Sequence, residues 1–88
     1  MDIEFPNLVP AKLTVIGTVS FQAIVDGEYL WCEISCEALR DHFCAPSMHS
    51  DDLLLAFYRN TAEIYQAVKD YLQINRAAPV VLMTANFR

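Results

Sequence analysis

Apolar and polar side chains alternate most clearly in residues 19–35, in two runs that flank the dipeptide Asp26-Gly27. An Asp-Gly pair between two such runs is a strong signal for the two-residue turn of a β-hairpin. A turn of this length fixes the register and places Gln22 opposite Trp31. The pattern therefore predicts a central antiparallel hairpin with two distinct faces.

The two predicted faces differ in character. One is almost entirely apolar and suited to a core; it comprises Val19, Phe21, Ala23, Leu30, Cys32 and Ile34. The other mixes aromatic, apolar and polar side chains; it comprises Ile24, Tyr29, Trp31, Gln22, Ser20 and Glu33. Aromatic side chains are enriched in protein interfaces, so the second face is the leading candidate for a binding surface. The alternative is coverage within the same chain by apolar side chains of an N-terminal arm over residues 3–10, namely Phe5, Leu8 and Val9.

Helical periodicity follows the hairpin. Ser35 is the expected N-cap of a short helix over residues 36–43. Ser50 is the expected side-chain cap of a second, long helix that runs to about Asn75. Asn60 interrupts the pattern of this helix, and we expect its side chain to hydrogen-bond to the chain rather than to a ligand.

The long helix carries one apolar stripe at helical spacing, which predicts that one face packs on the sheet. The stripe comprises Leu53, Phe57, Thr61, Ile64, Val68, Tyr71 and Leu72. Leu55 and Tyr58 fall outside it and either contact the short helix or add to an exposed apolar surface.

Both ends of the chain carry shorter strand signals. The N-terminal arm suggests an edge strand, residues 12–16 a short strand or extended piece, and residues 80–84 a strand opened by Pro79, with a tail over residues 85–88. The last strand can pair beside either hairpin strand or join the sheet of a second copy. The prediction is one α+β domain over residues 1–88: an antiparallel sheet built on a central hairpin, one short and one long helix on one face, and a C-terminal strand returning to the sheet.

Composition narrows the function classes. Apolar residues make up 55% of the chain and charged residues 19%, so apolar surface is in excess and self-association is one way to hide it. The net charge is -5 and the six basic residues are spread along the chain, which disfavours nucleic acid and anionic membranes as partners. No apolar run reaches the length of a bilayer span, and a cytoplasmic protein is expected.

Candidate chemistry is sparse. A zinc site would need converging thiols and imidazoles, but the spacings lack a paired motif; the available residues are Cys32, Cys36, His42, Cys44 and His49. We expect no metal and three free thiols. Cys36 near a helix N-terminus is a conceivable nucleophile, yet His42 lies six positions away on another helix face. No phosphate-binding, dinucleotide or hydrolase motif is present, so we expect neither enzyme activity nor a cofactor.

Several segments together resemble a family of small bacterial proteins known only as a domain of unknown function, number 1488. They are Ile3-Glu4-Phe5-Pro6, the run from Val19 to Gly27, Cys32-Glu33-Ile34-Ser35, Glu37-Ala38-Leu39, then Phe57, Asn60 and Ile64, and finally Val81-Leu82-Met83-Thr84 with Phe87. The resemblance implies a compact α+β domain in a bacterial cytoplasm and carries over no catalytic residue. Cys36, Cys44 and His49 lie outside the pattern.

We expect a non-enzymatic protein-interaction module, either a homodimer or an adaptor for another cytoplasmic protein. The expected interface comprises Ile24, Tyr29, Trp31, Gln22 and Tyr58. The alternative is a small-ligand-binding regulatory domain with a pocket between the long helix and the sheet, lined by Tyr58, Tyr65 or Tyr71.

Overall fold

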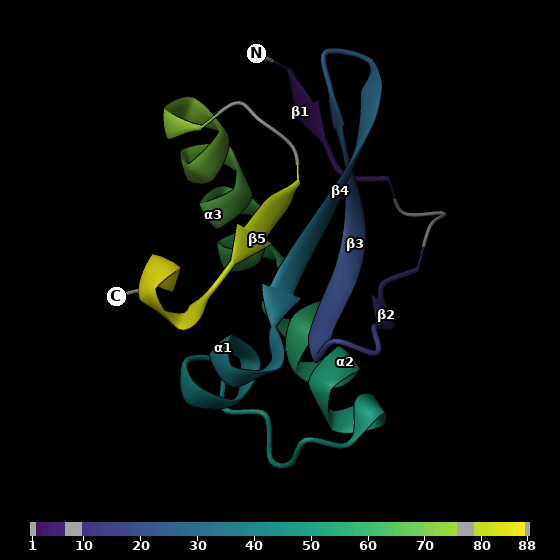
Figure 1. Ribbon diagram of the computed structural model, residues 1–88, viewed down its shortest axis with the longest axis vertical. Coiled ribbons are helices and arrows are strands. Elements are labelled where there is room, and N and C mark those ends of the chain that lie inside the picture. Colours follow the sequence, from purple (N-terminus) through teal and green to yellow (C-terminus); the bar gives the residue numbers. More distant parts are fainter. Residues whose placement is uncertain (1, 7–9, 76–78, 88) are drawn as a thin grey trace.

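Five strands form one mixed sheet in the computed structural model, which describes residues 2–6, 10–75 and 79–87 (Figure 1). The strands are β1 (Ile3–Glu4), β2 (Lys12–Leu13), β3 (Thr18–Val25), β4 (Glu28–Ser35) and β5 (Val80–Leu82). Their order is β1-β3-β4-β5, and β2 pairs with β3 beside β1. The helices are α1 (Cys36–Asp41), α2 (Ser50–Arg59), α3 (Thr61–Ile74) and a 3-10 helix, η1 (Thr84–Phe87).

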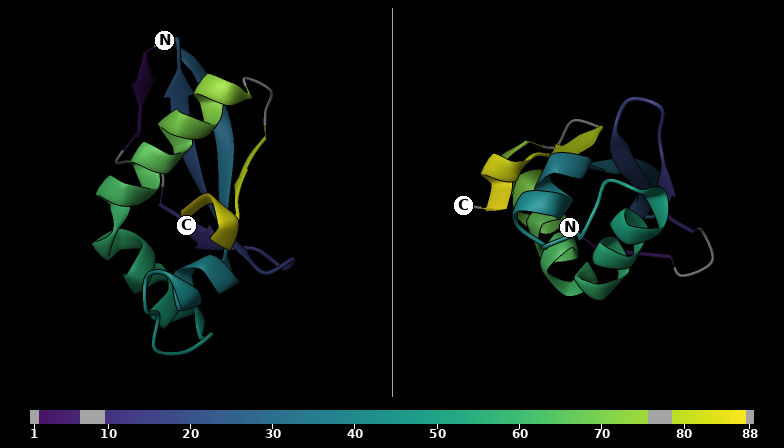
Figure 2. Two further views of the ribbon diagram at one scale, coloured as in Figure 1. Left: turned by 90° about the vertical axis from the view of Figure 1, so that its left-hand side faces the viewer. Right: turned by 90° about the horizontal axis from the view of Figure 1, so that it is seen from below.

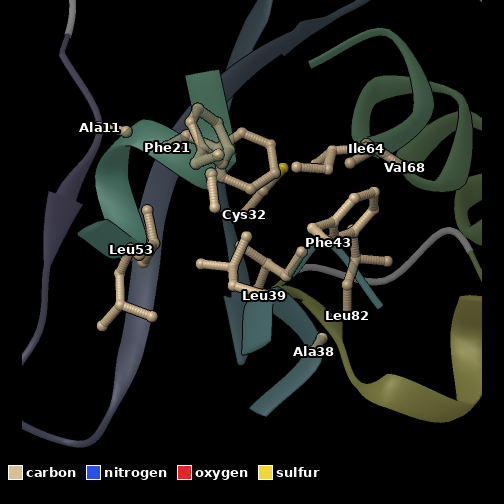
Figure 3. Packing of buried hydrophobic residues seen from close by; sticks show 14 of the residues in the cluster. Ala11, Phe21, Cys32, Ala38, Leu39, Phe43, Leu53, Ile64, Val68 and Leu82 are labelled. Carbon is tan, nitrogen blue, oxygen red and sulfur yellow. The ribbon is translucent and has the colours of Figure 1, made fainter. Parts of the chain in front are cut away.

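The predicted α+β class is confirmed. Helices α2 and α3 run along one face of the sheet, as the side view in Figure 2 shows. The buried apolar side chains of the described residues form one cluster between this face and the helices (Figure 3). Its fully buried members come from both layers, for example Val19 and Ile34 from the hairpin and Ile64 from α3.

The hairpin has the predicted register. All eight pairs from Thr18 opposite Ser35 to Val25 opposite Glu28 are formed, and they include Gln22 opposite Trp31. The turn residues Asp26 and Gly27 have φ values of 51° and 86°, as a primed two-residue turn requires. Glycine adopts a positive φ at little cost in free energy, and aspartate tolerates it. The dipeptide therefore fixes the pairing of β3 with β4.

The prediction of one long helix is wrong. The helix ends at Arg59 and a second begins at Thr61, with Asn60 between them at a non-helical φ of -126° and ψ of 26°. The Asn60 side chain donates a hydrogen bond from Nδ2 to the carbonyl oxygen of Ala56 at 2.8 Å, the kind of bond to the chain that we expected. The break allows α2 to contact β2 and β3 while α3 contacts β5.

Of the two predicted caps, one is confirmed. Ser35 Oγ accepts a hydrogen bond from the backbone nitrogen of Ala38 at 3.1 Å at the start of α1, which ends at Asp41, two residues before the predicted end. The predicted side-chain cap at Ser50 is wrong, because His49 occupies the N-cap position without a side-chain hydrogen bond. Asp52 instead accepts a hydrogen bond from Ser47 of the preceding loop at 2.6 Å.

The C-terminal strand pairs with β4 and runs parallel to it, so the sheet is not purely antiparallel. A parallel neighbour requires a long crossover, which the three helices supply. Val80 and Leu82 are fully buried, whereas Val81 points to the other face and is half-buried. The strand ends at Leu82, two residues before the predicted end. Part of the predicted tail forms η1, in which Asn86 Oδ1 accepts a hydrogen bond from the Met83 nitrogen at 2.7 Å.

The N-terminal arm begins with the suggested edge strand, since Ile3 pairs with Val25 of β3. Phe5 then stacks on Tyr65 of α3, with ring centroids 3.8 Å apart and planes 2° apart. Phe5 therefore lies on the helix-covered side of the sheet. Leu8 and Val9, the other predicted covering residues, lie outside the described residues.

Candidate functional site

The sheet face that points away from the helices is the leading candidate site, and we call it the outer face. Strand register assigns its side chains, because residues directly opposite each other share a face. The hairpin contributes Gln22 opposite Trp31 and Ile24 opposite Tyr29, while Glu4 of β1 lies opposite Ile24. The predicted second face of the hairpin is thus formed as expected.

Two aromatic side chains of the outer face are open to solvent. Tyr29 is 66% exposed and Trp31 is 47% exposed, and both precede Cys32, the first residue of β4 that pairs with β5 in the described structure. Ile24 and Gln22 beside them are half-buried. Because Phe5 packs on the opposite side, the described part of the N-terminal arm does not provide the coverage that the sequence left open.

A hydrogen-bonded network occupies the end of the outer face that lies away from the hairpin turn. Thr18 Oγ1 donates to Glu33 Oε1 at 2.6 Å and also contacts Thr14 Oγ1 at 2.7 Å. Ser20 Oγ donates to the carbonyl oxygen of Lys12 at 3.4 Å. Ser20 therefore joins β3 to β2, and Glu33 positions Thr18, which contacts the segment that follows β2.

Tyr58, the fifth predicted interface residue, lies apart from the other four. It belongs to α2, which covers the opposite face of the sheet. Its hydroxyl accepts a hydrogen bond from the backbone nitrogen of Ala11 at 2.9 Å, so this half-exposed side chain ties α2 to the segment before β2. The structure therefore gathers Ile24, Tyr29, Trp31 and Gln22, but not Tyr58.

Carboxylates surround the hairpin turn, a feature that the sequence analysis missed. The backbone nitrogen of Asp2 donates a hydrogen bond to Asp26 Oδ1 at 2.8 Å, and the backbone carbonyl oxygen of Asp2 accepts one from the Asp26 nitrogen at 2.8 Å. These two bonds hold Asp2 beside the turn. Glu4 follows on β1 and Glu28 on β4. Among the described residues, none of these four exposed carboxylates forms an ion pair. Only the pairing of β1 with β3 reveals this cluster.

The thiols and imidazoles are dispersed by the fold. Cys36 is buried, and burial together with the nearby Glu37 raises its pKa, which is the opposite of activation. His42 bonds through Nε2 to Glu63 Oε2 at 2.6 Å and stacks on Phe87. No group of three potential metal ligands converges anywhere in the part of the chain that the structure describes.

The tyrosines of the alternative ligand pocket are also separated. Tyr65 is held between Phe5 and Phe21, and burial raises its pKa. Tyr58 is tethered to Ala11. Tyr71 lines an open groove of about 390 Å³ between α3 and η1; its other lining residues are Ala67, Asp70, Ile74, Asn75 and Asn86. Of the three tyrosines, Tyr71 lines this groove against η1, whereas the described contacts of Tyr58 and Tyr65 include Ala11 and Phe5.

Fold and surface together define a small α+β domain whose sheet carries helices on one face and open aromatic side chains on the other. The chain belongs to the family described as a protein of unknown function, DUF1488, which matches residues 3–82. The resemblance inferred from the sequence is thereby confirmed. Comparisons with curated proteins and with solved structures gave no match. None of the described helices is long and apolar enough to cross a bilayer.

Proposed function

We propose that this chain is a cytoplasmic, non-enzymatic protein-interaction module that binds another polypeptide through the outer face. The observation that carries the proposal is the exposure of Trp31 and Tyr29 side by side on a sheet face without a covering helix in the described structure. Surfaces of this kind are the usual centres of protein interfaces, because aromatic rings bury large apolar area at a low entropic cost.

The dimensions of the outer face suggest a modest interface. Strands β3 and β4 each span eight residues, or about 26 Å at a rise of ~3.3 Å per residue. With adjacent strands ~4.8 Å apart, the two hairpin strands cover roughly 250 Å² in plan. Stable complexes bury about 800 Å² per partner, so we expect a reversible complex rather than an obligate one.

Site-specific photo-crosslinking tests the proposal. A photoreactive p-benzoylphenylalanine at position 29 is expected to form adducts in an extract of the source cells, because Tyr29 is the more exposed of the two aromatic side chains on the outer face. The same residue at position 58 is the matched control, since Tyr58 is similarly exposed on the opposite side. Adducts of twice the chain mass indicate a second copy, and other masses indicate a different protein.

Trp31→Glu is the companion variant. It is expected to abolish the adducts from position 29 by placing a charge in the interface, while changing the free energy of unfolding by about 1 kcal/mol or less, because Trp31 is half-exposed. Circular dichroism during thermal unfolding checks the second point. Equal crosslinking from positions 29 and 58, or adducts that survive Trp31→Glu, would contradict the proposal.

A second candidate function, binding of a small ligand, is supported by the groove beside Tyr71. Bound metabolites stabilise a folded protein, so a ligand in this groove would raise the melting temperature. Ala67→Trp would fill the groove and should remove such a shift. A metabolite panel that leaves the melting temperature unchanged would eliminate this candidate.

A further inference from the structure

We infer that the partner of the outer face is an arginine-bearing segment of a different protein rather than a second copy of this chain. The inference rests on the proposed function and names the chemistry of the partner. Two independent features carry it: the exposed aromatic pair Tyr29 and Trp31, and the carboxylates gathered around the hairpin turn next to them.

The negative charge lies at one end of the outer face. Glu4 of β1 lies on the outer face, and Asp2 and Asp26 border it at the hairpin turn, where two hydrogen bonds join them. Glu28 adds negative charge beside the turn, although it stands opposite Val25 and so belongs to the other face. Lys12 pairs with Ser20 toward the opposite end of β3. The ion pairs of the described residues, Arg40 with Asp41 and His42 with Glu63, involve none of these carboxylates.

Aromatic and acidic groups lie at a spacing that suits a guanidinium. Glu4, Ile24 and Tyr29 form one row across three strands, so Glu4 and Tyr29 are separated by two strand spacings, about 10 Å. The Debye length is about 8 Å at physiological salt, so the attraction between the Glu4 carboxylate and a cation stacked on the Tyr29 ring is only partly screened. Arginine combines both contacts, because its planar group stacks on aromatic rings and pairs with carboxylates.

The same charges disfavour a second copy. In a two-fold symmetric contact the same patch is used by both copies, so the carboxylates at the turn would be present twice in one interface. Each chain also has a net charge of -5, and like charges brought together in an interface are repulsive. Nucleic acids and anionic membranes are disfavoured for the same reason.

The emission of Trp31 provides a direct test, since Trp31 is the single tryptophan of the chain. The full chain is titrated with a capped peptide of alternating arginine and alanine, and separately with its glutamate counterpart. We expect a saturable change in emission with the arginine peptide, weakened by salt, and none with the glutamate peptide.

Two double variants of equal net charge separate local from overall electrostatics. Asp2→Asn with Glu4→Gln neutralises two carboxylates at the aromatic end of the outer face and should weaken binding of the arginine peptide about fivefold. Glu37→Gln with Asp51→Asn removes the same charge from α1 and α2 and should leave binding within twofold. Circular dichroism confirms that all variants fold.

Three outcomes would overturn the inference. Equal weakening by both double variants would mean that the peptide responds only to net charge. The absence of an emission change with the arginine peptide would exclude an arginine-bearing segment as the partner. A change in Trp31 emission on dilution without peptide, accompanied by a dimer mass in light scattering, would identify a second copy as the occupant. This result would reject the inference but leave the proposed function intact. The proposed function itself fails only if crosslinking from position 29 fails.

Discussion

Cys32 illustrates how burial controls the chemistry of a single residue. Its side chain is fully buried in the core, close to Phe21 in Figure 3. Burial disfavours the charged thiolate and raises the pKa of Cys32 to about 12 from an ordinary value of 9.0. Cys36 and Tyr65 also have raised pKa values, chiefly because of burial. These residues are therefore structural, and their protonation is linked to folding.

The linkage predicts loss of stability at alkaline pH. The folded-state pKa of Cys32 lies above its unfolded value, so its stabilising contribution is complete below about pH 9 and is lost as the pH rises toward 12. One such group changes the free energy of unfolding by at most about 1.4 kcal/mol per pH unit. Urea unfolding between pH 8 and pH 10.5 should show this decline.

Cys32→Ala is the variant that isolates the effect. It should lower stability at neutral pH by leaving a small cavity, and it should also flatten the alkaline decline by removing one titrating group. Cys44→Ala is the control, because Cys44 is an exposed free thiol. An alkaline slope that is identical in all three proteins would contradict the linkage.

At the scale of the element, the starts of α1 and α2 show that similar cap signals can have different outcomes. Ser35 forms its predicted side-chain cap, because β4 leads directly into α1 and holds Ser35 in extended geometry with φ of -67° and ψ of 147°. Ser50 does not, because the preceding loop places His49 at the N-cap position. Both helices carry acidic residues in their first turn. The path of the segment that precedes each helix therefore decides which residue occupies the N-cap position.

Two serine variants test this difference. Ser35→Ala should destabilise the protein by about 1 kcal/mol, because it leaves the Ala38 nitrogen without its acceptor. Ser50→Ala should change stability by only a few tenths of a kcal/mol, as expected for an exposed residue without a capping bond. Chemical unfolding at pH 7 provides both values. Equal losses from the two variants would refute the assignment of the caps.

Over the whole molecule, the region around His42 joins three elements that are distant in sequence. His42 at the end of α1 bonds to Glu63 of α3 at 2.6 Å. Phe87 of η1 stacks on His42 with ring centroids 5.3 Å apart, and it meets Phe43 edge-on at 5.0 Å. This contact closes the end of the core where the C-terminal segment returns to the helices.

A double-mutant cycle measures the coupling between His42 and Glu63. Because both side chains are partly exposed, we expect a coupling of about 0.5 to 1 kcal/mol from the single variants His42→Ala and Glu63→Ala and their combination. A parallel cycle of His42→Ala with Glu37→Ala should give a value near zero. Coupling of equal size in both cycles would show that the bond contributes nothing specific.

Prediction from the sequence succeeded where local geometry was sufficient. The Asp26-Gly27 turn fixed every hairpin pair and thereby the outer face around Trp31. The prediction of the helix failed at Asn60. A 3.6-residue repeat of apolar residues that continues through a one-residue break is indistinguishable in sequence from one unbroken helix. Tyr58 entered the expected interface as a residue of the long helix outside its apolar stripe, and the structure places it on α2, which covers the face opposite Trp31.

The α+β class, the hairpin register, the α1 cap and the family follow from the amino-acid sequence alone. These depend on turn chemistry, alternation and short-range hydrogen bonds, which neighbouring residues specify. Three features emerge only from the folded chain: β5 runs parallel to β4, Phe5 packs on Tyr65, and Asp2 joins Asp26 at the turn. Such contacts join segments far apart in the chain, and their formation depends on the combined packing of the sheet and helices rather than on any local pattern.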